Sequence, residues 1–191
     1  MSLLKIAQIG HPILRAKAQP LTMESLASPE IQLFIDNLVE TMRDAKGAGL
    51  AANQVHRPIQ ICAIEVQDNP RYPYKPNIPL TILVNPIIKV LDQETFKNFE
   101  GCLSVSNLRG IVDRYLGIEI QFWDRKGHPK TLEVRGLTAG TYQHEVDHLE
   151  GRIFLDRVTD SSSLCTWQHF EAYHRKNFEK HARSLVNQYG S

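Results

Sequence analysis

His144, Glu145 and His148 form the pattern His-Glu-x-x-His, whose residue types and spacing are suited to metal-dependent chemistry. Residues four apart lie on the same face of a helix, so both imidazoles can bind one metal ion. Glu145 would then be close enough to take a proton from metal-bound water. In a chain with 8 histidines the pattern can also arise by chance, so a metal site needs support from the rest of the sequence.

A catalytic metal usually has three protein ligands and one open position, so a third ligand has to be found. In the protease pattern that adds a third histidine, that residue would be position 154, which is Phe154. The thermolysin-like pattern places a glutamate about twenty residues after the second histidine. Position 168 is Gln168, and the nearest acid is Glu171. The first pattern is excluded and the second is weakened.

Cys102 is the other candidate, within Glu100-Gly-Cys-Leu-Ser104. A thiolate is a suitable ligand for zinc or ferrous iron, and Gly101 gives the backbone room to approach a ligand. The alternative is an ordinary buried cysteine, the commonest state of a free thiol. The residues alone leave both interpretations open.

The segment Gly47-Ala-Gly-Leu-Ala-Ala-Asn-Gln54 imitates a dinucleotide-binding loop. That loop needs a strand before it and a helix after it, whereas here a helix is expected before it and Pro58 follows soon after, so we discard nucleotide binding. Gln54 can donate its side-chain amide to a substrate oxygen. Alternatively, it can stabilise a turn.

The elements that position these segments follow from hydrophobic spacing. Ser28 and Pro29 begin a helix that runs to about residue 45 with one apolar stripe. A second helix is expected over 137–150 and a last one over about 162–187. The region between residues 59 and 136 is rich in short strand-like runs, with a hairpin turn at 124–127 and a long surface loop at 68–79. The expected strands are 60–66, 81–84, 87–91, 110–113, 118–123 and 131–134.

This order predicts an α+β fold, with antiparallel sheets around a central helix that carries the metal-binding pattern. A chain of 191 residues is expected to form a single domain, 1–191. The net charge of +1 gives no reason to expect nucleic-acid recognition or attraction to a membrane. Three widely spaced cysteines and the lack of a signal-like start favour a reducing, cytoplasmic location.

The three segments together resemble the peptide deformylases, which carry G-x-G-L-A-A-x-Q, then E-G-C-L-S, then Q-H-E-x-D-H in this order. Here they are Gly47–Gln54, Glu100–Ser104 and Gln143–His148. The start Ile9-Gly-His-Pro12 is similar to the family as well, and the resemblance covers roughly residues 5–160.

The resemblance implies an enzyme that removes the formyl group from the N-terminal methionine of new proteins and releases formate. Cys102, His144 and His148 would bind one divalent metal ion, typically ferrous iron, with zinc, nickel or cobalt able to replace it. Metal-bound hydroxide would attack the formyl carbon, with Glu145 as general base and then general acid. Gln54 and the backbone N–H of Leu103 would form the oxyanion hole.

The implied substrate is the N-formylmethionyl end of a nascent peptide, bound as an added strand. The segments expected to contact it are Gly47, Ala48 and Gly49 on one side and Glu100, Gly101 and Arg109 on the other. An apolar pocket for the methionine side chain is expected near residues 137–141. Glu100 and Arg109 could instead be structural charges.

The chain departs from the family at Ser106-Asn107, where many members have Pro-Gly, so the shape of that loop is in doubt. The 68–79 loop is longer than in compact bacterial members. The long C-terminal helix suggests transient ribosome contact. A metalloprotease and a non-enzyme with a structural metal remain as alternatives, although a structural site would need a fourth protein ligand.

Overall fold

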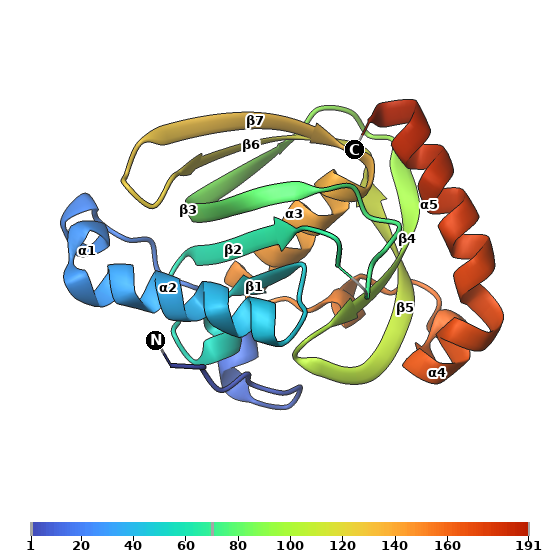
Figure 1. Ribbon diagram of the computed structural model, residues 1–191, viewed down its shortest axis with the longest axis horizontal. Coiled ribbons are helices and arrows are strands. Elements are labelled where there is room, and N and C mark those ends of the chain that lie inside the picture. The colour runs from blue at the N-terminus through green and yellow to red at the C-terminus, as the bar shows by residue number, and fades with distance from the viewer. Residues whose placement is uncertain (1, 70, 191) are drawn as a thin grey trace.

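The computed structural model describes residues 2–69 and 71–190 and has the expected α+β architecture with antiparallel sheets. Figure 1 shows a short helix α1 and a longer helix α2 near the N-terminus, a strand-rich middle and helices at the C-terminal end. In chain order the helices and strands are α1 (Met23–Ala27), α2 (Pro29–Asp44), β1 (Gly49–Ala51), β2 (Ile61–Val66), β3 (Ile78–Val90), β4 (Thr95–Cys102), β5 (Val105–Tyr115), β6 (Gly117–Trp123), β7 (Pro129–Arg135), α3 (Gly136–Leu149), β8 (Cys165–Thr166), α4 (Trp167–His169) and α5 (Arg175–Tyr189).

The strands form two separate sheets. One sheet has the order β1-β2-β3-β6-β7, and the other has the order β4-β5-β8, with every pair antiparallel. The β6–β7 hairpin closes at the expected turn, where the backbone N–H of Gly127 donates to the carbonyl of Asp124. Strands β1 and β4 are edge strands, so one side of each has no strand partner within its sheet.

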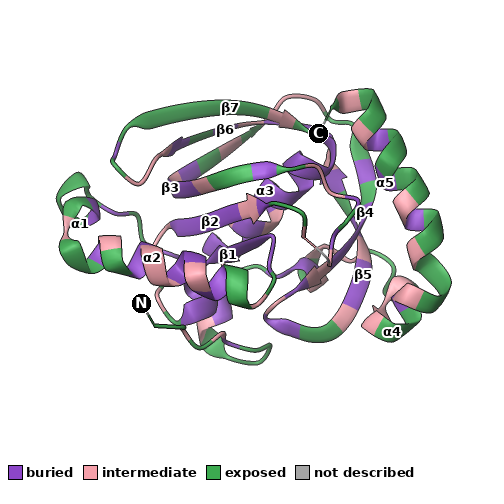
Figure 2. Ribbon diagram, in the orientation of Figure 1, coloured by how far each residue is buried: buried purple, intermediate pink, exposed green. Residues whose placement is uncertain are grey.

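Helix α3 lies at the centre of the molecule and contacts strands of both sheets (Figure 1). Nearly all of its residues are buried, as the purple ribbon in Figure 2 shows. A helix that is enclosed on all sides does not need an amphipathic pattern, so its polar residues point into the protein. The His-Glu-x-x-His pattern is therefore held in a rigid interior.

Helix α2 covers β1 and β2 and matches its prediction closely. Ser28 caps it by accepting the backbone N–H of Ile31 at 3.3 Å, and Pro29 occupies the first helical position. Its apolar stripe packs in one core cluster with Leu50 and Ala63, from β1 and β2. This packing fixes the strand that begins just after Gly47.

Two expected strands, 81–84 and 87–91, are one strand, β3. The sequence suggested a break because Asn85-Pro86 lies between them. In the structure these residues lie within β3 and shift the register of its pairing with β6. Asn85 has φ 51°, and its side chain forms hydrogen bonds with the backbone N–H and C=O of Leu21. Strands β1, β4 and β8 were missed.

The single C-terminal helix expected over 162–187 was wrong at its start. Residues 161–163 form a 3₁₀ turn, β8 follows, and the helical stretch begins at Trp167 and passes through a π-helical turn, Phe170–His174, before α5. Polar side chains cause this interruption. Asp160 caps the 3₁₀ turn and Thr166 caps α4, so a new helical segment begins after each of these residues.

The segment 68–79 is not the simple surface loop that was expected. Tyr72 and Tyr74 are 8% and 6% exposed, and residues 78 and 79 belong to β3. Pro70 lies outside the described residues. The two tyrosines pack edge-on against each other, and Tyr74 packs against Phe178 of α5. The segment is therefore anchored by aromatic contacts close to the cavity described below.

None of the helices in the described ranges is both long enough and apolar enough to span a membrane.

Candidate metal centre and active site

Cys102 comes together with His144 and His148 although it lies more than 40 residues before them in the chain. Cys102 ends β4, and the two histidines lie one turn apart on α3. One ligand atom from each lies within 4.8 Å of the other two, and Cys102 Sγ is 3.3 Å from His148 Nε2. Burial raises the pKa of a thiol, but here His148 and His144 outweigh it and lower the pKa of Cys102 to about 5. A thiolate between two imidazoles is a suitable set of ligands for a divalent ion.

Glu100 orients one of these histidines. Its Oε2 is 2.8 Å from His144 Nδ1, which leaves the other ring nitrogen to face Cys102. Arg114 donates to both oxygens of Glu100 at 2.8 Å, and Asn98 donates to Oε1 at 3.0 Å. Such a carboxylate–histidine contact fixes the ring and its tautomer. Glu100 therefore has all its bonding capacity engaged by the protein, as expected for a structural charge.

Glu145 faces the same space with a carboxylate that is only partly satisfied. It is 4% exposed, and its Oε2 has no hydrogen-bond partner among the described residues. Burial raises the pKa of Glu145 above its ordinary value, although His144 and His148 oppose the shift. A methyl group on Gly49 would lie 2.4 Å from the Glu145 carboxylate, so only glycine lets β1 pass this close.

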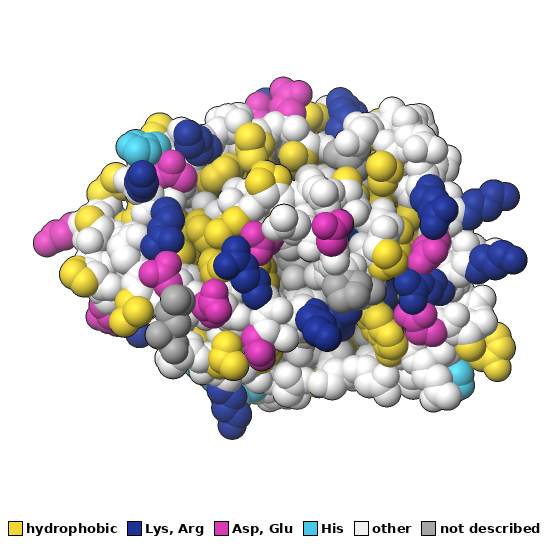
Figure 3. All heavy atoms as spheres, in the orientation of Figure 1, with side chains coloured by type: hydrophobic (Ala, Val, Ile, Leu, Met, Phe, Trp, Pro, Cys, Tyr) yellow, Lys and Arg dark blue, Asp and Glu magenta, His cyan; other side chains and the backbone are white. Residues whose placement is uncertain are grey.

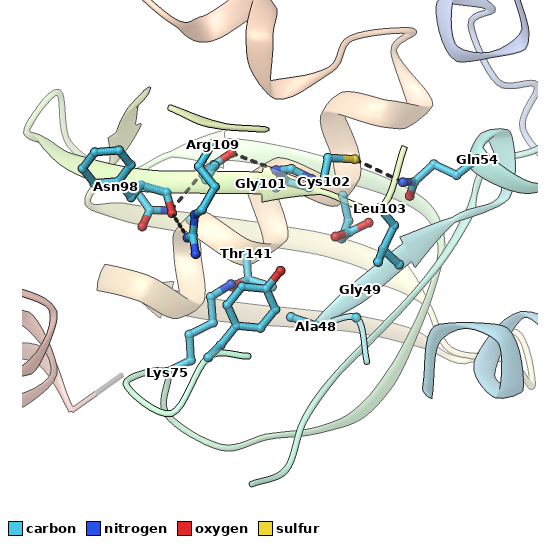
Figure 4. A pocket seen from close by; sticks show the side chains of 17 residues that line it. Ala48, Gly49, Gln54, Lys75, Asn98, Gly101, Cys102, Leu103, Arg109 and Thr141 are labelled. Atoms are coloured by element: carbon cyan, nitrogen blue, oxygen red, sulfur yellow. Dashed lines mark hydrogen bonds and ion pairs between the residues drawn. The ribbon is translucent and has the colours of Figure 1, made fainter. Parts of the chain in front are cut away.

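Gln54 reaches the cluster from the short helical turn after β1. Its Oε1 accepts the backbone N–H of Ala51 at 2.9 Å, which fixes the direction of the amide. Its Nε2 then points to Cys102 Sγ at 3.3 Å (Figure 4) and also to Ser104 Oγ at 3.1 Å. The side chain therefore stabilises the turn, as one interpretation of the sequence expected, and its amide is placed beside Cys102, while donation to a substrate oxygen stays a prediction.

Two edge strands frame the site. β1 lies on one side and β4 on the other. The lining residues include Gly47, Ala48 and Gly49 at the start of β1 and Gly101, Cys102 and Leu103 at the end of β4. The free edges of such strands can pair with an extended peptide. The backbone of Leu103 directly follows the ligand Cys102, so its N–H belongs to the same turn as the metal cluster.

The cavity beside the cluster has a volume of about 40 Å³. Arg109 lines it from β5 and Lys75 from the 68–79 segment (Figure 4). Sequence reasoning found Arg109 but missed Lys75 and Asn98. No motif marks either residue, because each reaches the cavity from a segment whose course depends on the fold.

The segment 137–141, near which an apolar pocket was expected, lines the cavity only in part. Gly140 and Thr141 line the cavity, whereas Leu137 and Ala139 are buried in the core. Thr141 accepts a hydrogen bond from Lys75 Nζ at 2.9 Å. This end of the cavity is therefore polar.

Asn107, one of the two residues at which the resemblance breaks, has a left-handed backbone, with φ 55°. Its side chain accepts the backbone N–H of Trp167 at 3.2 Å, and Ser106 Oγ bonds Gln8 Oε1 at 2.6 Å. The departure at these two positions is thus accommodated without displacing Cys102 from the cluster.

A buried His₂Cys cluster with a free carboxylate beside it, held between antiparallel sheets, defines a metal-dependent hydrolase. The described residues include no fourth histidine, cysteine or acid within this cluster. The chain belongs to the polypeptide deformylase family, whose model matches residues 3–163. Two curated relatives are peptide deformylase 2 of Nostoc sp., 37% identical over 175 residues (92% of this chain and 97% of that protein), and peptide deformylase 1 of Bordetella pertussis, 41% identical over 155 residues (81% and 87%).

Solved structures of the family share the fold. The Met-Ala-Ser-bound class I type b peptide deformylase from Acinetobacter baumannii has a TM-score of 0.79 and 33% identity, covering 82% of this chain and 99% of that one. The Synechococcus elongatus peptide deformylase in complex with actinonin has a TM-score of 0.74 and 30% identity, covering 94% and 88%. The chain is therefore an enzyme of this family.

Proposed function

We propose that the chain hydrolyses the terminal formamide of N-formylmethionyl peptides and releases formate. Family membership supports removal of a formyl group from nascent peptides. The observation that carries the residue assignment is the convergence of Cys102, His144 and His148 beside the unpartnered Glu145 carboxylate.

Cys102, His144 and His148 would hold one divalent ion. Ferrous iron is the ion we propose, and zinc, nickel or cobalt would fit the same two imidazoles and one thiolate. When bound, the ion supplies Lewis-acid activation of water and of the formyl oxygen. Glu100 keeps His144 oriented for this role through its 2.8 Å contact.

Glu145 would hold and transfer the proton of the reaction. A general base works best when its pKa lies near the working pH, and burial raises the pKa of Glu145 in that direction. The free Oε2 is available to take a proton from the attacking water. The same oxygen would return the proton to the departing amine of the peptide.

Gln54 and the backbone N–H of Leu103 would stabilise the oxyanion. Replacing Gln54 with Ala is expected to lower kcat by about 10²–10³, because one donor to the developing charge is lost. Formate release by the metal-loaded variant measures this. Ser104→Ala is the matched control, since it removes an acceptor of Gln54 Nε2 but leaves the donor in place. Equal losses in the two variants would contradict the role given to Gln54.

An extended peptide would bind between the edges of β1 and β4, along Gly47–Gly49 and Gly101. A solved relative holds the tripeptide Met-Ala-Ser, which is consistent with this arrangement. A metalloprotease would use the same three residues of the His-Glu-x-x-His pattern. Cleavage of unformylated casein, with no release of formate, would favour it.

The direct test is formate release from formyl-Met-Ala-Ser by protein purified without oxygen and loaded with ferrous iron, or with nickel in air. Metal-dependent release supports the proposal. A protein that binds one ion per chain and releases no formate would contradict it.

We also propose transient contact with the ribosome through α5. Lys176, Lys180 and Arg183 are exposed at helical spacing, and basic side chains project at the edge of the molecule where α5 lies (Figure 3). Deleting α5 would remove Phe178 and expose Tyr74 and Phe99, against which it packs, so point changes are the better test.

Replacing Lys176, Lys180 and Arg183 together with Gln is expected to lower co-sedimentation with ribosomes at least about tenfold, because contacts to phosphate are lost. The control replaces Lys89, Lys126 and Lys130, which are exposed outside α5, with Gln. A loss of the same size in both triple variants would indicate nonspecific charge attraction and would remove the ribosome-contact proposal.

A further inference from the structure

The cavity beside the metal cluster contains two cationic side chains, Arg109 and Lys75, and neither forms an ion pair within the described ranges. Both lie against the ring of Tyr72: Arg109 Cζ is 6.0 Å and Lys75 Nζ is 5.0 Å from its centroid. Figure 4 shows the guanidinium of Arg109 extending toward the Lys75 side of the cavity. Two positive groups held close together without a direct ion-pair partner favour a ligand that brings a negative charge.

Arg109 is 1% exposed and only partly satisfied. Its Nη2 donates to the Phe99 carbonyl at 2.6 Å and to the Tyr74 hydroxyl at 3.2 Å. Its Nε and Nη1 have no partner in the part of the chain that the structure describes. The guanidinium also stacks on Phe170, 4.0 Å from the ring centroid, which fixes its plane. The free N–H groups, held in a fixed plane, can each donate to an oxygen of an anionic ligand.

Lys75 brings a second donor to the same space. Its Nζ makes one hydrogen bond, to Thr141, and an ammonium can make three. Burial lowers the pKa of Lys75 to about 8, with Glu100 and Glu145 opposing the shift, so the amine is largely protonated at neutral pH. An anion in the cavity would stabilise this charge further.

The acidic groups nearby do not form direct ion pairs with these two cations. Glu100 is bonded to Arg114, His144 and Asn98, and Glu145 has no ion pair with Lys75 or Arg109. The Cys102 thiolate and Glu145 together balance the two cations, so a divalent ion in the cluster would leave the site positive. A substrate with a negative group complements this field.

The remaining lining and the size of the cavity are consistent with a small polar group. Asn98, Gly140 and Thr141 give the cavity a polar wall beside Lys75. The apolar part of its lining includes Tyr72, Phe99 and Leu103. A volume of about 40 Å³ exceeds the roughly 10–15 Å³ that one water requires, and is far below the ~300 Å³ at which drug-sized ligand sites begin. It holds a group the size of a carboxylate without rearrangement.

We propose that this cavity is a subsite for a carboxylate located within one residue of the formamide, bound by Arg109 and Lys75. The proposal rests on the proposed function, because it names the class of formylated substrate that the same site selects. The carboxylate has two possible sources: the side chain of a first residue such as glutamate, or the main-chain carboxylate of a free formyl amino acid.

The test measures binding in the absence of turnover, by calorimetry on nickel-loaded Glu145→Gln protein. One arm compares formyl-Glu-Ala-Ser amide with formyl-Gln-Ala-Ser amide, which differ only in charge. The other compares formyl-Met with formyl-Met methylamide. We expect the acid to bind about 10- to 100-fold more tightly than its neutral partner in at least one arm, the range for hydrogen bonds to a charged group. The arm that shows the preference identifies the source.

Lys75→Met keeps the stem and removes the amine, so it is expected to reduce that preference at least about fivefold, and Lys75→Arg is expected to restore most of it. Lys89→Met, which removes one exposed lysine of β3, is the matched control and should leave the ratio unchanged. The same ratios of kcat/KM are then measured with the Glu145-containing protein.

No preference in either arm, or a preference that Lys75→Met leaves intact, overturns the subsite. That result is independent of the proposed function, which fails only if formate is released from no formylated peptide. A binding preference without turnover would therefore retain the subsite and reject the deformylase activity. Turnover of formyl-Met-Ala-Ser without any preference for the acid would support the deformylase activity and reject the subsite.

Discussion

Glu145→Gln is expected to bind its metal ion normally and to lose kcat for formate release by about 10²–10⁴ or more. The substitution is isosteric, and the Glu145 Oε2 has no protein partner in the described part of the chain, so little of the structure depends on its charge. An amide cannot take the proton of the attacking water. The loss should therefore fall on kcat, while peptide affinity changes little.

Glu150→Gln is the matched control for this substitution. Glu150 caps the C-terminal end of α3, so Glu150→Gln makes the same chemical change at the end of the same helix. Its side chain is exposed and pairs with Lys17 at 2.8 Å. Its effect on formate release should be small. Bound metal is measured in all three proteins. A Glu145→Gln protein that retains both metal and full turnover would exclude Glu145 as the proton carrier.

The sequence predicted the metal cluster well because its information is local. His144 and His148 are four residues apart, so one helix is enough to bring them together. Cys102 lies far from α3 in the chain, so its residue type and neighbours were equally consistent with an ordinary buried cysteine. Only the pairing of β4 with β5 and the packing of both against α3 bring it within reach.

The cavity wall could not be predicted in this way. Lys75 reaches the site because Tyr72 and Tyr74 anchor its segment to Trp167 and Phe178, which lie about 100 residues further along the chain. A proline-rich stretch carries no periodic signal from which that path could be read. Strand β4 was missed for a related reason, because its polar residues Asn98 and Glu100 are buried and break the usual alternation.

Arg114 is the second residue for which we expect a large effect, through stability and not through chemistry. It is 2% exposed and lies between two carboxylates, donating twice to Glu100 at 2.8 Å and once to Asp147 at 2.5 Å. Arg157 donates to both oxygens of the same Asp147. Neither Arg114 nor Asp147 had an assigned role in the sequence, yet their network joins β4, β5 and α3 behind His144.

Arg114→Met is expected to lower the free energy of unfolding of the metal-free protein by about 3–5 kcal/mol at neutral pH, because it leaves Glu100 buried without its main counter-charge. Arg125→Met, which breaks an exposed pair with Asp36, should cost at most about 1 kcal/mol. Urea denaturation followed by circular dichroism gives both values. Equal losses would show that burial of the network contributes nothing beyond a surface pair.

The pH dependence distinguishes loss of a counter-charge from simple loss of packing. In the unmodified protein, burial opposes the charge of Glu100, but Arg114 and His144 hold its pKa well below the usual range. The resulting stability is present above the unfolded pKa of about 4.3 and is lost as the pH falls through the folded value. In Arg114→Met, the charge of Arg114 no longer opposes the effect of burial, so the pKa of Glu100 rises. The carboxyl then becomes protonated as the pH falls, which removes the cost of burying its charge. The stability difference between the two proteins should therefore shrink between neutral pH and about pH 4, whereas a packing defect would keep it constant.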